Sequence, residues 1–588
     1  MRRAAGAAFA RLRMNLLDWL VLVGTIVGIA AYGAWHTRHT DNLNTYLKGN
    51  YNTGWLTIGL SVMATQASTI TYLSLPGQAY ENGISFIQNY FGLPLALIVV
   101  CAAFLPIYRK LGVYTAYEYL GKRFDAKTHL LGAALFLLQR GIQAGITIYA
   151  PAIILSTVLG WRLDLTIICT GLLVIVYTVT GGSAAVNLTQ KWQMAVIWGG
   201  MIAAFVVLLA KLPHNAAHIA GAMGKLQGVD FTPDFKRRYT LLSGLLGGFF
   251  LSLSYFGTDQ SQVQRYIGGA ALREGRLGLM FNAIFKIPMQ FLIVMLGSLL
   301  FVFYQFQPDT PVFFNQTEWR HHAAGPQAAS FQEIEKKYAA QHAQKQGKIR
   351  AWVTTLDRGD AAAEASARAA MIDACDAAEV TREEARNALR SADPKANTKD
   401  SDYVFITFIL TQLPHGFIGL LIAVMFASAL SSKAGELNAL GTTSTIDLWR
   451  RFRPLAAHDE ARNVRSAKWF TALWGLFAIG FALFVSFAEN LIEALNIVAS
   501  IFYPALLGVF VVAFFLKKVG GSAVFWAAVA SQVLVIALFF MGKIYPAHEI
   551  GYLWLNPIGC TACVLFSLVF QAAIGIKSSS VGQTVQSA

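Results

Sequence analysis

About thirteen apolar stretches of roughly 20 residues or more constrain this chain more than any other feature of its sequence. A stretch of that length crosses a bilayer as a helix, because all of its backbone polar groups then bond within the segment. With 55% hydrophobic and 13% charged residues, the chain also carries more apolar surface than water-soluble cores could bury. We therefore expect an all-α polytopic membrane protein embedded in a lipid bilayer. The stretches fall near 15–35, 54–79, 85–107, 128–158, 163–180, 188–211, 238–264, 277–305, 404–446, 467–486, 489–515, 522–541 and 552–576.

The excess of basic residues, 47 against 32 acidic ones, indicates membrane orientation and not nucleic-acid binding. The short basic clusters lie in loops between apolar stretches, and such loops stay on the cytoplasmic side. Placing loops 108–127, 265–276 and 447–468 inside predicts an outside amino terminus and a cytoplasmic carboxyl terminus, in a bacterial inner membrane. Four arginines before the first stretch favour the opposite orientation, and a start at Met14 or cleavage of 1–35 as a signal peptide would remove the conflict. They are Arg2, Arg3, Arg11 and Arg13.

Enzyme chemistry has no evident motif in this sequence. Four of the five cysteines lie in apolar stretches, and the Cys560-x-x-Cys563 pair is more typical of helix packing than of a metal or redox site. No cluster of His, Cys and carboxylate residues and no phosphate-binding glycine loop stands out. We therefore predict that the chain is not an enzyme.

Residues 306–403 form the one large polar segment. It is rich in Ala, Lys, Glu, Gln and Asp, with helix-like runs at 333–346 and 382–391. We expect a few amphipathic helices over the extracellular mouth of the protein, and a disordered insert is the alternative.

Two apolar stretches place small residues and hydroxyls where a membrane helix normally avoids them: Ala64-Thr65-Gln66-Ala67-Ser68-Thr69 and Ser428-Ala429-Leu430-Ser431-Ser432. A sodium ion in a bilayer must exchange its water for protein oxygens, which hydroxyls and the carbonyls of a broken helix supply. Stretch 54–79 is easily broken at its centre, and 238–264 has a comparable weak point at Gly247-Gly248 through Gly257. Broken helices at matching places predict an inverted-repeat, cation-coupled transporter, with close Gly/Ser helix packing as the alternative.

Five segments together resemble the sodium/solute symporter family in order and spacing. They are Ala64–Gly83, Tyr149–Ala152, Tyr177–Gly182, Asp259–Tyr266 and Ser431–Asp447. The match covers about 15–305 and 404–576, and it looks most like the branch of iodide, monocarboxylate and multivitamin transporters. The resemblance implies a LeuT-type fold of two inverted five-helix repeats, at 54–211 and 238–515. One peripheral helix (14–36) would precede them and two (516–576) would follow, with tails at 1–13 and 577–588.

The same resemblance implies a site between the first and eighth core helices. Its sodium ligands would be the carbonyls of Ala64, Ala67 and Ser428 and the hydroxyls of Ser431 and Ser432. The residues lining the substrate pocket would be Gln66, Thr71, Tyr90, Ser252, Tyr255, Phe256 and Lys286. Because most of the polar set that sugar-transporting relatives carry is missing, a sugar is disfavoured. Tyr255 and Phe256 would form an aromatic floor, or simply pack in the core.

Two cations, Arg140 and Lys286, lie deep in apolar stretches, with only neutral polar residues near them in sequence. An intramembrane charge needs a partner, which could be a substrate carboxylate or a residue distant in sequence. Arg140 therefore joins the predicted substrate site. Lys433 and Glu436 are three residues apart on one helix and can pair with each other.

One departure from the family pattern concerns stoichiometry. Relatives usually carry an acid in a Thr-Asp-x-x-Gln pattern, where this chain has Gln190. The acid is associated with the inward exit of the ion and with a second sodium site in some members, so we expect one sodium per cycle.

The sequence thus predicts sodium-coupled symport of a small organic solute, anionic in character, such as a monocarboxylate, vitamin or sugar acid. The alternatives are a proton-coupled or neutral-solute (sugar or amino acid) symporter of the same fold. A transporter-like sensor is disfavoured because only twelve residues follow Ile576. We expect neither nucleic acid nor an obligate protein partner.

Overall fold

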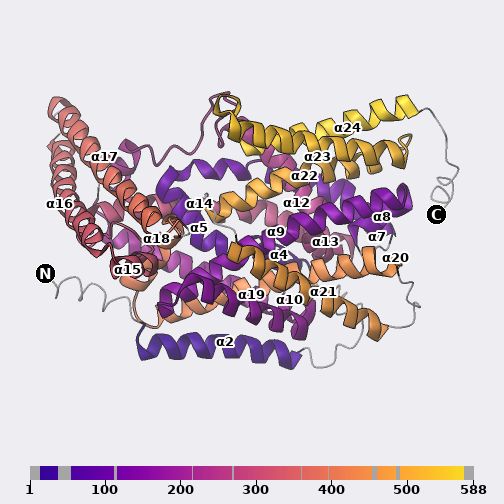
Figure 1. Cartoon of the computed structure of the whole chain (residues 1–588), viewed down its shortest axis with the longest axis horizontal. Coiled ribbons are helices and arrows are strands. Elements are labelled where there is room, and N and C mark those ends of the chain that lie inside the picture. Colours follow the sequence, from indigo (N-terminus) through magenta and orange to yellow (C-terminus); the bar gives the residue numbers. More distant parts are fainter. Residues whose placement is uncertain are drawn as a thin grey trace.

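The computed structural model describes residues 14–36, 54–111, 115–214, 216–267, 271–358, 361–394, 396–452, 460–484 and 490–574. Within these ranges the chain is helical and contains no strand, and its long helices run roughly side by side (Figure 1). Nine helical segments of the described part are long and apolar enough to cross a membrane, and two shorter ones are also apolar. The polytopic all-α class is confirmed, while the number of thirteen spans stays a prediction. The predicted tails, 1–13 and 577–588, lie outside the described residues.

The first half of the chain contains the helix break that the sequence predicts. The stretch 54–79 is divided into α4 and α5 at Ala67 and Ser68, where hydroxylated residues compete with the backbone for hydrogen bonds. The elements are α2 (Leu16–His36), α4 (Trp55–Gln66), α5 (Thr69–Asn82), η1 (Gly83–Tyr90), α6 (Leu93–Val99), η2 (Val100–Phe104), α7 (Leu105–Leu111), α8 (Ala116–Arg123), α9 (Ala126–Leu159), α10 (Leu163–Lys211) and α11 (Ala216–Ala222).

The second half differs from the prediction for 238–264. The helix continues through Ser252 and Gly257, and the irregular parts are a π-helical turn, η3, and a break at Asp259. Within this helix, the Thr258 hydroxyl donates to the carbonyl of Ser254 at 2.8 Å. The elements are η3 (Ser243–Gly247), α12 (Gly248–Thr258), α13 (Gln260–Ile267), α14 (Leu272–Phe306), α18 (Ser401–Gln412), α19 (Phe417–Thr443), η4 (Ser444–Trp449), α20 (Arg450–Phe452), α21 (Glu460–Phe484), α22 (Leu491–Phe515), α23 (Gly521–Ile544) and α24 (Leu555–Ile574).

Two further boundaries correct the sequence prediction. The stretch 404–446 is two helices, α18 and α19, because Pro414 cannot continue α18 and Gly416 adopts φ +88°. The Gly416 amide donates to Asp18 of α2 at 2.6 Å, which ties α2 to the start of α19. Conversely, 163–180 and 188–211 belong to one continuous helix, α10, so the Gly181-Gly182 pair does not end it.

The insert is a helical hairpin and not a disordered segment in its described part. It comprises α15 (Gln316–Ala323), α16 (Ala328–Arg358) and α17 (Ala361–Ala392), and both helix-like runs of the sequence lie within α16 and α17. Helices α16 and α17 lie side by side beyond one end of the bundle, opposite α7, α8 and α20 (Figure 1). Trp319 and Phe331 pack with Leu389 inside the insert, while Trp352 packs with Ile219 of α11. The hairpin is therefore fixed to the bundle by an apolar contact.

Candidate ion and solute site

The break between α4 and α5 lies against α19. The last backbone bond of α4 runs from the Ala67 amide to the carbonyl of Met63, and Ala67 itself has φ −89° and ψ 62°. The carbonyls of Ala64 and Ala67 therefore lie beyond that bond, at the end of a helix where carbonyls need other partners. The Thr69 hydroxyl donates to the carbonyl of Met425 on α19 at 2.5 Å, which holds the broken helix against α19.

The three predicted serines lie on the buried part of α19. The Ser431 hydroxyl donates to Oε1 of Gln193 on α10 at 2.7 Å and lies 3.1 Å from the carbonyl of Ser428. The Ser432 hydroxyl is fully buried and has no hydrogen-bond partner among the described residues. A buried hydroxyl without a partner is costly, and a cation beside it would satisfy it. The residues present therefore fit a small hard cation.

A cavity of about 120 Å³ opens beside this break. Six of the residues predicted from the sequence line it, contributed by α5, α9, α12 and their neighbours: Gln66, Thr71, Tyr90, Arg140, Ser252 and Tyr255. Phe256 does not line the cavity. It is buried in the core, with its ring 5.0 Å from that of Tyr255. Of the pair, only Tyr255 lines the cavity, and its hydroxyl accepts a hydrogen bond from Gln262 at 2.6 Å. The aromatic floor stays a prediction.

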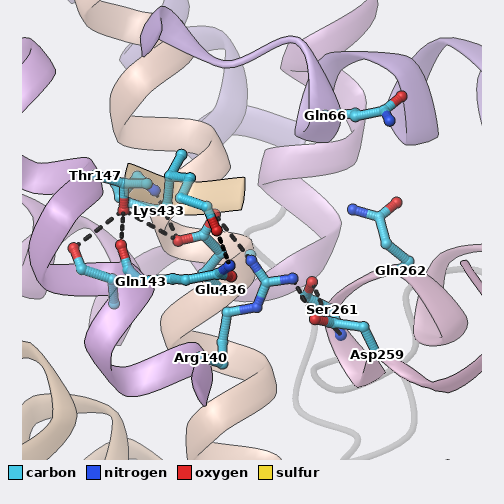
Figure 2. A network of polar contacts seen from close by, with 12 residues as sticks. Gln66, Arg140, Gln143, Thr147, Asp259, Ser261, Gln262, Lys433 and Glu436 are labelled. Carbon is cyan, nitrogen blue, oxygen red and sulfur yellow. Dashed lines mark hydrogen bonds and ion pairs between the residues drawn. The ribbon is translucent and has the colours of Figure 1, made fainter. Parts of the chain in front are cut away.

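Arg140 lies between two carboxylates (Figure 2). One guanidinium nitrogen is ion-paired with Asp259, whose other neighbour is the Tyr503 hydroxyl at 2.6 Å. The second nitrogen lies 3.6 Å from Glu436, and Glu436 is paired with Lys433 at 2.6 Å. The predicted Lys433–Glu436 pair is thus present, and it extends into a four-charge network at the wall of the cavity.

Of the two alternatives for the partner of Arg140, the structure shows protein carboxylates that are distant in sequence. Its partners come from α19 and from the break after α12, both far away in sequence. Asp259 is fixed in turn as the cap of α13, because it accepts bonds from the Ser261 amide at 2.8 Å and the Ser261 hydroxyl at 2.6 Å. Arg140 nevertheless lines the cavity, and its Nε atom has no hydrogen-bond partner in the described structure.

Lys286 is the second deep cation, and its position differs from that of Arg140. Its side chain is fully buried and does not line the cavity. Its ammonium lies 5.8 Å from the centroid of the Tyr90 ring, and it makes no hydrogen bond with any described residue. Lys286 therefore sits behind Tyr90, one side chain away from the cavity.

Several lining residues were not predicted from the sequence. On α9, Gln143 and Thr147 follow Arg140 at helical spacing. On α22, Asn496 and Tyr503 are also spaced so that they lie on one face of the helix. Polar residues at this spacing in apolar helices are a signal that the sequence carried. The remaining lining residues are Thr65, Ser68, Ile70, Asn89, Leu251, Glu436, Ile492, Leu495 and Ala499.

A buried polar contact centred on Arg265 joins three helices. Arg265 of α13 is buried, and its Nη1 donates to the Ser61 hydroxyl at 2.7 Å and to Oε1 of Gln190 at 2.9 Å. Gln190 and Gln193, the partner of Ser431, are neighbours one turn apart on α10. The residue that replaces the family's acid therefore joins α4, α10 and α13 next to the serines.

A family model described as the sodium:solute symporter family matches residues 46–318 and 387–530, well over half of the chain. The chain belongs to the sodium:solute symporter family. The two matched stretches leave out 319–386, which is most of the insert.

Individual relatives of this symporter agree with the family assignment. The human sodium/iodide cotransporter is 31% identical over 284 residues, 48% of this chain and 43% of that protein. The chain thus spans less than half the length of that relative. The sodium/sialic acid symporter SiaT of Proteus mirabilis (strain HI4320) is 22% identical over 561 residues, 94% of each chain. These relatives are transporters, as predicted, and not enzymes.

A solved structure of a Na+-coupled sialic acid symporter in a substrate-bound, outward-open state has the same fold. The TM-score is 0.70 at 21% identity, covering 94% of this chain and 97% of the other. The predicted LeuT-type fold class is thereby confirmed.

Proposed function

We propose that this chain is a sodium-coupled symporter that moves a small organic anion, of the size of a monocarboxylate, by alternating access. The observation that carries the proposal is the cavity beside the α4–α5 break, next to buried serines and lined by Arg140. Relatives named for sodium-coupled transport of iodide, vitamins and monocarboxylates support the coupling ion.

For the ion, we propose the five oxygens of Ala64, Ala67, Ser428, Ser431 and Ser432. Support comes from the two carbonyls at the end of α4 and from the unsatisfied Ser432 hydroxyl. Because Gln190 is neutral and already bonded to Arg265, we further propose a single sodium ion per cycle.

For the solute, size and charge both favour a small anion. The cavity is small, about 120 Å³, and we propose a monocarboxylate in preference to a vitamin or a sialic acid. In and behind the cavity wall, the cations of Arg140, Lys433 and Lys286 outnumber the carboxylates of Asp259 and Glu436. One more negative charge would balance the group, and a solute carboxylate can supply it.

For orientation, we propose that the insert faces the outside of a bacterial inner membrane and that the carboxyl terminus is cytoplasmic. The basic residues of α7, α8 and α20 lie at the end of the bundle opposite the insert (Figure 1), as the rule for cytoplasmic loops requires.

Uptake into proteoliposomes tests the function directly. An inward sodium gradient should drive accumulation of a labelled monocarboxylate such as pyruvate or lactate, and an equal potassium gradient should not. Iodide, biotin, glucose, an amino acid and sialic acid complete the panel. Uptake driven by a proton gradient alone would refute the proposed coupling ion. Uptake of neutral solutes only would refute the proposed solute.

A further inference from the structure

A second, larger chamber lies between the insert and the end of the bundle. Its volume is about 820 Å³. The bundle contributes Tyr80 of α5, Tyr149 of α9 and Tyr304 of α14, while α16, α17, Pro394 and residues 396–402 form the opposite wall. Because the family model omits 319–386, much of this wall is built by a segment outside the matched family stretches.

The chamber and the central cavity follow each other along the same helices. On α9, Thr147 lines the central cavity and Tyr149 the chamber, and at the start of α22, Ile492 and Leu491 are divided in the same way. Asn490 lies at this boundary. Its Nδ2 donates to Asp402 of α18 at 2.8 Å and to the carbonyl of Ser74 of α5 at 3.1 Å. A solute that enters from the side of the insert must therefore pass the chamber before it reaches the Asn490 contact.

Six of the twelve charged residues that line the chamber form ion pairs with one another. Arg382 donates to the carbonyl of Pro311 at 3.0 Å and lies 3.7 Å from Asp400, and Arg386 pairs with Glu379 at 2.8 Å.

Lys345 of α16 is different. It lines the chamber and is only 5% exposed, yet its ammonium makes no hydrogen bond or ion pair with any described residue. Burial and the positive charge of Arg382 lower the pKa of Lys345 to about 8, so at pH 7 it still carries its charge. Glu379 lies within electrostatic reach of Lys345 but forms no ion pair with it. A poorly solvated ammonium outside any ion pair is costly, and an anion in the chamber would offset that cost.

We propose that the chamber binds the solute carboxylate through Lys345 before the solute reaches the central cavity. The identity of the ligand rests on the proposed function. The site itself rests on the geometry of the insert. The chamber collects a small anion on the outer side, and the link between Asn490 and Asp402 separates it from the central cavity.

Cys375 is a built-in reporter for this chamber. It lines the chamber wall on α17 and lies within electrostatic reach of Lys345. The other four cysteines lie in the bundle helices and can be replaced by alanine, which leaves Cys375 as the single thiol. Its rates of reaction with two membrane-impermeant methanethiosulfonates, one bearing a sulfonate and one a trimethylammonium group, then measure the charge of the chamber. The same pair of rates on the denatured protein corrects for intrinsic reactivity.

We expect the corrected ratio of rates to favour the anionic reagent by about tenfold, as for an anion entering a cleft of opposite charge. Lys345→Gln should remove most of that preference, and millimolar pyruvate should slow labelling of the parent protein but not of this variant. Lys348→Gln is the matched control, because Lys348 is exposed on the same helix. Equal corrected rates for the two reagents would overturn the proposal. It would also be overturned if Lys345→Gln left unchanged both the preference for the anionic reagent and the protection by pyruvate.

Labelling requires neither sodium nor transport, so the two proposals fail separately. If sodium drives no uptake but pyruvate still protects Cys375 in a Lys345-dependent way, the symport assignment is refuted and the chamber site is supported. Normal uptake without any Lys345-dependent preference or protection would refute the chamber site alone.

Discussion

Replacing Ser432 by alanine is a clean test of the proposed sodium site. Its hydroxyl is fully buried and makes no hydrogen bond with the described residues, so its removal breaks no hydrogen bond of the protein. Ser431→Ala is less clean, because the Ser431 hydroxyl also bonds to Gln193 at 2.7 Å. Any loss in Ser432→Ala can therefore be attributed to the ion.

The size of the effect follows from the loss of one oxygen ligand. A hydrogen-bond-class interaction with a charged partner contributes about 1.5–3 kcal/mol. The sodium concentration for half-maximal uptake should accordingly rise roughly 10- to 150-fold. Without sodium, the melting temperature should stay the same or rise, because a costly unpartnered hydroxyl is gone.

Two measurements check this: the sodium dependence of uptake in proteoliposomes, and the rise in melting temperature on adding sodium. The control is Ser567→Ala. Ser567 is equally buried, but its hydroxyl donates to the carbonyl of Cys563 on α24, away from the site. That variant should keep the sodium dependence of the parent. If Ser432→Ala keeps it too, in both measurements, then Ser432 is not a sodium ligand.

Three other changes test the solute site and the insert. Lys286→Met should reduce uptake of a monocarboxylate at least tenfold more than uptake of its neutral amide, whereas equal losses would indicate a structural role. Replacing 320–395 by a flexible linker should leave uptake measurable with a higher KM, since loop length changes closure entropy only slowly; complete loss in a well-folded deletion would make the insert part of the gate. Burial lowers the pKa of His342 to about 4, against about 6.5 in an unfolded chain, so the stability of the insert is fully present above pH 6.5 and falls by up to about 3 kcal/mol toward pH 4. Amide exchange of α16 should therefore be faster at pH 5 than at pH 7 by more than the intrinsic change, and His342→Gln should remove that difference; unchanged protection would contradict the argument.

The sequence predicted the features that depend on local chemistry. The break at Ala67 was predicted because Thr65, Ser68 and Thr69 crowd the centre of an apolar stretch, and the structure ends α4 there. The stretch 404–446 was predicted as one span because its high mean hydropathy conceals the break at Pro414 and Gly416, although both residues are evident in the sequence.

Features that depend on tertiary contact could not be predicted. Nothing in the sequence near Arg140 points to Asp259, because the two residues lie on different helices and meet only when α9 packs beside the end of α12. The same holds for the chamber, since the position of Lys345 relative to the bundle follows from the docking of Trp352 against α11. The local sequence pattern predicts where helices form and break. Contacts between residues on different helices can be identified only from the folded structure.

The proposed stoichiometry of one sodium ion per cycle, which rests on the neutral side chain of Gln190, has a consequence for how the membrane voltage acts on uptake. A cycle that carries one sodium ion with one monocarboxylate moves no net charge across the bilayer. The membrane potential, worth about 2.3 kcal/mol per elementary charge at 100 mV, then does no work on the cycle. Accumulation follows the sodium concentration ratio alone, so that a tenfold ratio, about 1.4 kcal/mol, sustains a tenfold solute ratio. Uptake of this kind continues undiminished when a cell depolarises, as long as the sodium concentrations on the two sides are kept apart.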